Sequence, residues 1–137
     1  MVSRENIDSV RESMDSFLKS IFGNSLMLWV LVTREGYEVL GNSNNDVLYK
    51  QVMSATMSYI YVTAHKSLKR FLGNVHVYSV VVNIRHSDKD YSAVVMFHPL
   101  FFLVMMFERE ALCKFTENEK EIERALSSHV GRLFTKK

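Results

Sequence analysis

The sequence predicts an α+β domain built on a five-stranded antiparallel sheet. Two stretches, Leu26–Val32 and Leu100–Phe107, are apolar at every position, which is typical of central strands covered on both faces. Three longer stretches repeat their apolar residues every three or four positions, as amphipathic helices do. Connections between consecutive strands are short, which favours antiparallel pairing. The expected element order is α-β-β-α-β-β-β-α.

The first helix is expected over residues 4–22. Ser3 can cap its start, and Gly23-Asn24 can end it in a left-handed conformation. Its buried face is predicted to consist of Ile7, Val10, Met14, Phe17, Leu18 and Ile21.

A β-hairpin is expected to follow this helix. The strand Leu26–Thr33 returns as Tyr37–Leu40, and Gly36 supplies the positive φ that the tight turn between them needs. The polar run Gly41–Asn45 is the clearest loop in the sequence.

Asn45 or Asp46 is expected to cap a long helix that reaches about Leu72 and ends at Gly73-Asn74. One apolar stripe of this helix consists of Leu48, Val52, Ala55, Tyr59 and Val62. The other consists of Met53, Met57, Ile60, Ala64, Leu68 and Phe71. The narrow polar remainder comprises Lys50, Ser54, Ser58, His65 and Lys69. At about 100° per residue the two stripes lie more than a quarter-turn apart. A surface helix needs only one apolar stripe to pack on its own core. We therefore expect a partner protein to cover the second stripe.

Three more strands are expected in the second half. Val75–Ile84 can be an edge strand, which a second copy could hide by pairing with it. The charged loop Arg85–Asp90 leads to the strand Tyr91–Phe97, and His98-Pro99 turns the chain into the strand Leu100–Phe107.

A mixed connection over Glu108–Phe115 is expected before the final helix. Thr116 and Glu119 form a capping-box pattern that predicts where the helix begins. Its apolar stripe consists of Ile122, Ala125, Leu126, His129, Val130 and Leu133.

Length and composition limit the function classes. A chain of 137 residues suits one domain over residues 1–137. A net charge of +2 does not favour nucleic-acid binding, and the single cysteine excludes an intramolecular disulfide. The charged N-terminus is unlike a signal peptide, and no apolar stretch approaches the roughly 20 residues of a membrane span. We expect a cytoplasmic or nuclear protein, which could be peripheral to membranes through its partners.

Local motifs for catalysis, cofactors or metals are missing from the sequence. It has no phosphate-binding loop, dinucleotide fingerprint, zinc-protease motif or nucleophile elbow. We therefore expect no catalytic residue, cofactor or metal. A pocket that united His98, Cys113 or Asp90 would instead indicate an enzyme or a ligand sensor. The preferred interpretations are a turn residue for His98, a small, partly buried apolar residue for Cys113, and a core or interface residue for His129.

A basic cluster lies near the end of the long helix. His65, Lys66, Lys69 and Arg70 could contact phosphate, acidic lipid or an acidic partner, which makes a membrane-surface module a further hypothesis. The alternative is a solvated helix end whose cations suit the helix dipole.

The order of elements resembles the Roadblock (dynein light chain type) family, which has a profilin-like or longin-like fold. The stretch Leu28–Leu40 is similar to the strand–turn–strand of that family, with a glycine at the turn, and the long helix begins after Asn44-Asn45-Asp46. The resemblance covers residues 4–134.

This resemblance implies a three-layer α/β/α arrangement with strand order 2-1-5-4-3. It also implies dimers in which the long helices pack together and the third strands pair at the sheet edge. On that basis the dimer surface would consist of Leu48, Val52, Ala55, Tyr59, Val62, Val75, Val77 and Ser79.

Roadblock proteins act as scaffolds or regulators for small Ras-like GTPases, or as subunits of dynein or adaptor complexes. The resemblance therefore implies a non-catalytic regulatory subunit that forms a homodimer or pairs with a Roadblock-like subunit. Two alternatives stay open: a longin-like vesicle-traffic module, against which the helix at 4–22 argues, and a ligand-sensing or enzymatic domain with a non-local site.

Overall fold

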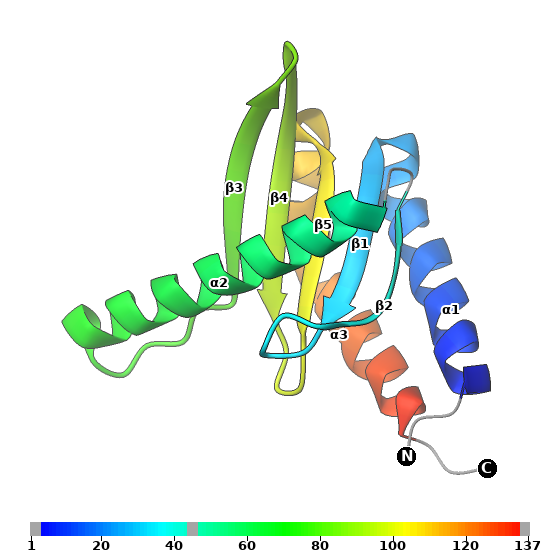
Figure 1. Ribbon diagram of the computed structural model, residues 1–137, viewed down its shortest axis with the longest axis horizontal. Coiled ribbons are helices and arrows are strands. Elements are labelled where there is room, and N and C mark those ends of the chain that lie inside the picture. The colour runs from blue at the N-terminus through cyan, green and yellow to red at the C-terminus, as the bar shows by residue number, and fades with distance from the viewer. Residues whose placement is uncertain (1–3, 44–46, 135–137) are drawn as a thin grey trace.

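The computed structural model describes residues 4–43 and 47–134. Two layers of helices enclose one sheet: α2 crosses one face, and α1 and α3 cover the other (Figure 1). The helices and strands are α1 (Arg4–Phe22), β1 (Leu26–Val32), β2 (Glu38–Ser43), α2 (Val47–Leu72), β3 (Ser79–His86), β4 (Lys89–Phe97), β5 (Phe102–Glu108) and α3 (Leu112–Leu133). Short 3₁₀ turns at Gly23–Ser25 and Arg109–Ala111 follow α1 and precede α3.

The five strands form one antiparallel sheet in the order β2-β1-β5-β4-β3. The expected fold class, element order and strand order are therefore confirmed. The two most apolar strands, β1 and β5, pair with each other in the interior of the sheet, because their side chains are covered on both faces.

Each face of the sheet has its own core. Towards α1 and α3, the core includes Trp29, Leu103 and Phe107 of the sheet. Towards α2, a smaller core forms around Met57 and Tyr61, which pack on strand residues such as Val30, Val95, Phe102 and Val104. The sheet thus separates two hydrophobic clusters of different size.

The second strand is longer than the sequence predicts. Gly41, Asn42 and Ser43 were expected in a loop, but they belong to β2 and pair with Val30, Trp29 and Leu28. A Cβ atom on Gly41 would lie 2.5 Å from the backbone oxygen of Trp29, so only glycine fits this close approach. Polar residues can extend this strand because it lies at the sheet edge.

The third strand begins four residues later than predicted and ends two residues later. Val75 and Val77 precede β3, and the Val77 carbonyl accepts a hydrogen bond from the Tyr61 hydroxyl at 2.6 Å. The loop between β3 and β4 is only the two-residue turn Ser87-Asp88, in which both residues have positive φ, as type I′ hairpin turns require.

The start of β5 and that of α3 also differ from the predictions. Leu100 is exposed in the turn after β4, which is closed by a hydrogen bond from the His98 amide to the Phe101 carbonyl at 3.0 Å. The capping-box prediction is wrong, because α3 begins at Leu112 and the Thr116 hydroxyl donates to the Leu112 carbonyl inside the helix. Buried Phe115 extends the apolar stripe two turns earlier.

Candidate interaction surface

Helix α2 contacts the sheet through one narrow face. Met57, Ser58 and Tyr61 are buried there, as is Ser54 one turn earlier. The sequence analysis placed the two serines on the polar outer remainder, which is wrong: they lie against the sheet, where small side chains let the helix approach closely. The Ser54 hydroxyl donates to the Lys50 carbonyl at 2.6 Å, and Lys50 itself pairs with Glu38 at 3.0 Å.

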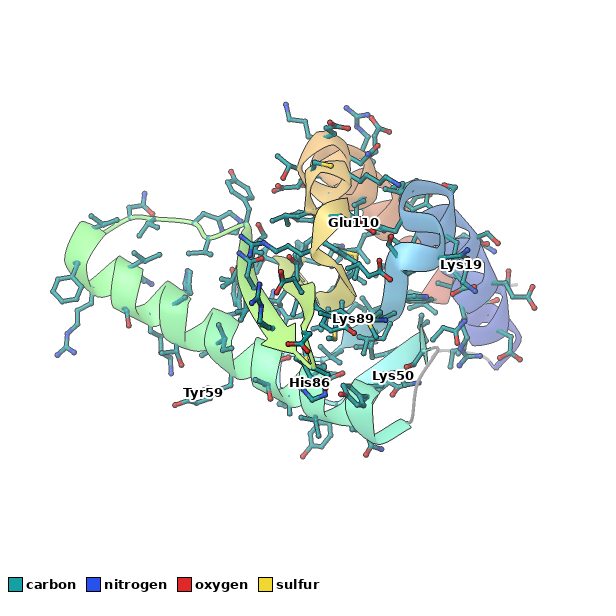
Figure 2. The ribbon with its side chains drawn as sticks, turned by 90° about the horizontal axis from the view of Figure 1, so that it is seen from above. Lys19, Lys50, Tyr59, His86, Lys89 and Glu110 are labelled. Carbon is teal, nitrogen blue, oxygen red and sulfur yellow. The ribbon has the colours of Figure 1, made fainter. Side chains whose placement is uncertain are left out.

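The predicted partner stripe of α2 lies largely in solvent. Val52, Ala55 and Tyr59 are exposed, and Val62 is half-buried. The side chain of Leu48 lies outside the described residues. Figure 2 shows Tyr59 pointing away from the body of the molecule, and 73% of its surface is exposed. The helix therefore presents apolar side chains away from its own sheet.

The C-terminal turns of α2 extend beyond the sheet. In Figure 1 the end of the helix passes β3, and residues 66–74 are all exposed. The second predicted stripe is consequently divided: Met57 is buried over the sheet, whereas Leu68 and Phe71 are exposed because no strand lies beneath them. Phe71 is 83% exposed, and Leu72 beside it is also exposed.

The overhanging helix end lies next to an open sheet edge. The strand order ends at β3, so in the described part of the chain no strand pairs with its outer side. Ser79 is half-buried at the start of β3, and Val81 is exposed within it. We call α2 from Val52 to Leu72, together with β3, the α2–β3 surface.

The four residues of the basic cluster lie near the end of α2. Lys66, Lys69 and Arg70 are exposed, and their spacing of three and four residues places them on one side of the helix, whereas His65 is half-buried beside Tyr61. Only His65 and Lys66 line a hollow, and they share it with Arg34, which the sequence analysis did not select.

Two of the residues that could have formed an active site lie at opposite ends of one strand. Asp90 lies near the start of β4, and His98 follows its end. Arg85 bonds to the Asp90 carboxyl at 2.8 Å and thereby lowers its pKa. Burial and the neighbouring Arg34 lower the pKa of His98, whose Nδ1 accepts the Leu100 amide at 3.1 Å.

Cys113 lies at the start of α3, three residues after Glu110, which shares a hollow with Asp90, and His129 lies near the end of the same helix. Cys113 was expected to be partly buried but is exposed, on the side of the first turn of α3 away from buried Phe115. His129 is half-buried, and burial, together with the charge of Arg132, lowers its pKa. No group of three or more metal-ligating side chains occurs within residues 4–43 and 47–134, and none of the helices described there is long and apolar enough to cross a membrane.

Sequence reasoning missed a polar cluster that joins α1 to the first hairpin. One Asp15 oxygen accepts hydrogen bonds from Trp29 Nε1 and Asn42 Nδ2, both at 2.9 Å, and the other pairs with Lys19 at 2.8 Å. Burial alone would raise the pKa of Asp15, but these hydrogen bonds outweigh it and lower the pKa. The sequence did offer a signal for this cluster: Asp15 lies three positions before the buried stripe residue Leu18 and one helical turn before Lys19.

No family model matches the chain, and no curated protein matches it in sequence. Solved structures do share its architecture. A Roadblock/LC7 domain from Streptomyces avermitilis has a TM-score of 0.65 at 17% identity, covering 98% of this chain and 100% of its own. Myxococcus xanthus MglB has a TM-score of 0.71 at 15% identity, covering 99% and 97%.

A further structure, described as MglB with a tetrameric arrangement, has a TM-score of 0.72 at 15% identity and covers 98% of this chain and 96% of its own. The chain therefore has the fold of Roadblock domains, from its first described helix to its last. The structural match establishes this fold, and at identities of 15–17% it establishes the fold alone.

Proposed function

We propose that this chain is a non-catalytic scaffold that dimerises through its α2–β3 surface. One observation carries the proposal: α2 extends past the last strand and exposes Leu68, Phe71 and Leu72 where no part of its own sheet can cover them. Soluble proteins seldom leave such contiguous apolar area in water.

A second copy would cover this surface by symmetry. If two β3 edges pair antiparallel about a twofold axis, the partner's sheet continues beneath the overhanging end of α2. The interface would then include Val52, Ala55, Tyr59 and Val62 of the helix, Ser79 of β3, and Val75 and Val77 just before that strand; Leu48 is proposed with them from the sequence pattern. Burying a side chain the size of Phe71 contributes roughly 1.5–3 kcal/mol before the cost of association is subtracted.

Self-association also agrees with a structural neighbour, since one MglB of the same fold is described in a tetrameric arrangement. A partner of related fold could take the place of the second copy, because the paired edge strand and helix would be of the same kind. In that case the chain alone would be monomeric and would dimerise on addition of the related subunit.

Light scattering after gel filtration tests the proposal. At micromolar concentration we expect about twice the chain mass of 15.9 kDa. Tyr59→Asp should return the mass to that of one chain, because it places a charge in the apolar interface. Tyr37→Asp is the matched control: Tyr37 is also 73% exposed, but it lies between β1 and β2 and outside the α2–β3 surface.

A wild-type chain that is monomeric at all concentrations, alone and with Roadblock-like subunits, would refute the proposal. Equal loss of mass in both variants would show that dimerisation uses another surface.

We further propose that the dimer binds a small Ras-like GTPase, as the resemblance to Roadblock proteins implies. Gel filtration with Ras-like GTPases from the same cells, loaded with GDP or a GTP analogue, should show co-elution that depends on the nucleotide. Failure of every such GTPase to co-elute would leave a scaffold for other complexes and remove the GTPase role.

A further inference from the structure

A hollow of about 300 Å³ lies between α2 and the loops at the ends of β1 and β4. Its apolar walls are the rings of Tyr61, Phe97 and Phe102, with Val62 beside them. Arg34, His65 and Lys66 also line it. An apolar interior bordered by nitrogen-bearing side chains suits a ligand with both apolar and anionic parts.

Arg34 is held in place before any ligand arrives. Its Nη2 donates to the carbonyls of His98 and Pro99 at 2.6 and 2.8 Å. The guanidinium carbon lies 4.4 Å from the centre of the Phe97 ring and 5.0 Å from that of Phe102. A guanidinium has five N–H donors, so those on Nε and Nη1 stay available for a second acceptor.

Within the described part of the chain, no carboxylate forms an ion pair with Arg34 or Lys66. Elsewhere in the described part of the chain, Arg11, Lys19, Lys50, Arg85 and Arg124 each pair with a carboxylate. None of these described pairs includes Arg34 or Lys66, and no acidic side chain lines the hollow. A half-buried cation beside apolar rings interacts strongly with an arriving anion, because little water screens it there.

We propose that this hollow binds an acidic–apolar segment of a partner protein. An apolar side chain of that segment packs on the rings of Phe97 and Phe102, and an adjacent carboxylate bonds to Arg34 and is attracted by Lys66. The volume is at the low end for small-molecule pockets, which favours one or two side chains over a nucleotide. The concave, ring-lined shape favours a peptide over a flat lipid surface.

This inference does not require the dimer proposed above. The hollow borders the α2–β3 surface, because Tyr61, Val62, His65 and Lys66 belong to that stretch of α2. The dimer proposal is carried by Leu68, Phe71 and Leu72, which do not line the hollow.

Fluorescence anisotropy tests the proposal with a labelled ten-residue peptide in which a phenylalanine–leucine pair is flanked by glutamates. Saturable binding to the wild-type chain is expected. Lys66→Glu should weaken it about five- to tenfold, because it replaces an attractive charge at the hollow by a repulsive one. Lys66 is exposed, so this change leaves the fold intact. Lys69→Glu makes the same charge change three residues further along but outside the hollow, and should change affinity less than about twofold. Arg34→Gln should weaken binding more than either.

Two further peptides separate the contribution of the acidic residues of the ligand from that of its apolar residues. Replacing the glutamates by glutamines, or the phenylalanine–leucine pair by glycines, should each abolish measurable binding. Light scattering on the same samples should show equal mass for the wild type and Lys66→Glu, so that loss of peptide binding is distinguished from loss of the dimer.

Several outcomes would overturn the proposal. One is the absence of saturable binding to the wild type, and another is equal weakening by Lys66→Glu and Lys69→Glu. Displacement of the peptide by millimolar inorganic phosphate would indicate a simple anion site. Binding to phosphatidylserine vesicles but not to the peptide would assign the hollow to a membrane surface instead.

Discussion

On one face of the sheet, α1 and α3 seal a core that extends from Val10 near the N-terminus to Leu133 near the C-terminus. On the other face, α2 alone crosses all five strands and then leaves them, with Phe71 and Leu72 in solvent. The same strands supply both faces: Leu103, Met105 and Phe107 of β5 point to the first, and Phe102 and Val104 to the second.

The difference indicates that the two faces have different tasks. Two helices packed side by side close the first face completely, which is what a self-sufficient folding core requires. A single helix closes only part of the second face. Its remaining apolar area is available for association. Truncating an apolar side chain should therefore lower monomer stability on the first face and weaken association on the second.

Truncating one phenylalanine on each face should give the largest contrast. Phe107 is fully buried and stacks on Phe22 with ring centres 4.6 Å apart, so Phe107→Ala should lower the free energy of unfolding by about 3–5 kcal/mol. Phe71→Ala removes the same atoms from an exposed position and should lower the monomer stability by less than about 0.5 kcal/mol. Urea unfolding at low protein concentration measures both.

In an association assay, the two phenylalanine variants should show the opposite order of effects. Phe71→Ala should weaken dimerisation measurably by analytical ultracentrifugation, whereas any folded fraction of Phe107→Ala should dimerise as the wild type does. A large loss of monomer stability in Phe71→Ala would mean that the end of α2 belongs to the core.

The polar cluster at Asp15 should give the next largest effect, and it lies on the sealed side. Asp15→Ala leaves the indole N–H of buried Trp29 without its acceptor, so the expected loss of stability is about 1–3 kcal/mol. Urea unfolding monitored by the fluorescence of the single tryptophan reports the change directly. Lys19→Ala removes only the more exposed partner and should cost about 0–1 kcal/mol.

Acid should weaken the sealed side through the same carboxyl. The folded pKa of Asp15 lies below its ordinary value of 3.8, so its stabilising contribution is complete above that value and is lost as the pH falls through the lowered folded pKa. The stability difference between the wild type and Asp15→Asn should therefore be largest near neutral pH and should shrink below about pH 4. A difference that stays constant from pH 7 to pH 2.5 would contradict this assignment.

The sequence predicted those parts of the fold that depend on a long apolar pattern. Continuous runs identified β1 and β5 as central, and the stripe of α1 was confirmed because Val10, Met14 and Leu18 are buried. The strand order came from the resemblance to Roadblock proteins, since a pattern of hydrophobicity does not state which strands are neighbours.

Predictions failed where a tertiary contact overrode a local signal. Gly41 and Asn42 have loop composition, but close packing on Trp29 and the bond to Asp15 hold them in β2. The capping pattern at Thr116 does not mark the start of α3, because the helix begins at Leu112 and buries Phe115 in its first turn. Arg34 has no distinctive sequence context, and only the folded chain brings it over Phe97 and Phe102 beside Lys66.

The smallest effect is expected at two serines on the sheet side of α2. Ser58 is 4% exposed, and its hydroxyl has no hydrogen-bond partner among the described residues, whereas the Ser54 hydroxyl donates to Lys50. Both substitutions to alanine gain a similar helix propensity of about 0.5 kcal/mol, so their difference isolates the hydroxyl groups. Ser58→Ala should stabilise the chain by up to about 1 kcal/mol more than Ser54→Ala, because it removes a buried polar atom without removing a bond. Thermal unfolding of the two variants at one protein concentration measures this difference, and an equal or greater loss of stability in Ser58→Ala would show that its hydroxyl is bonded in solution.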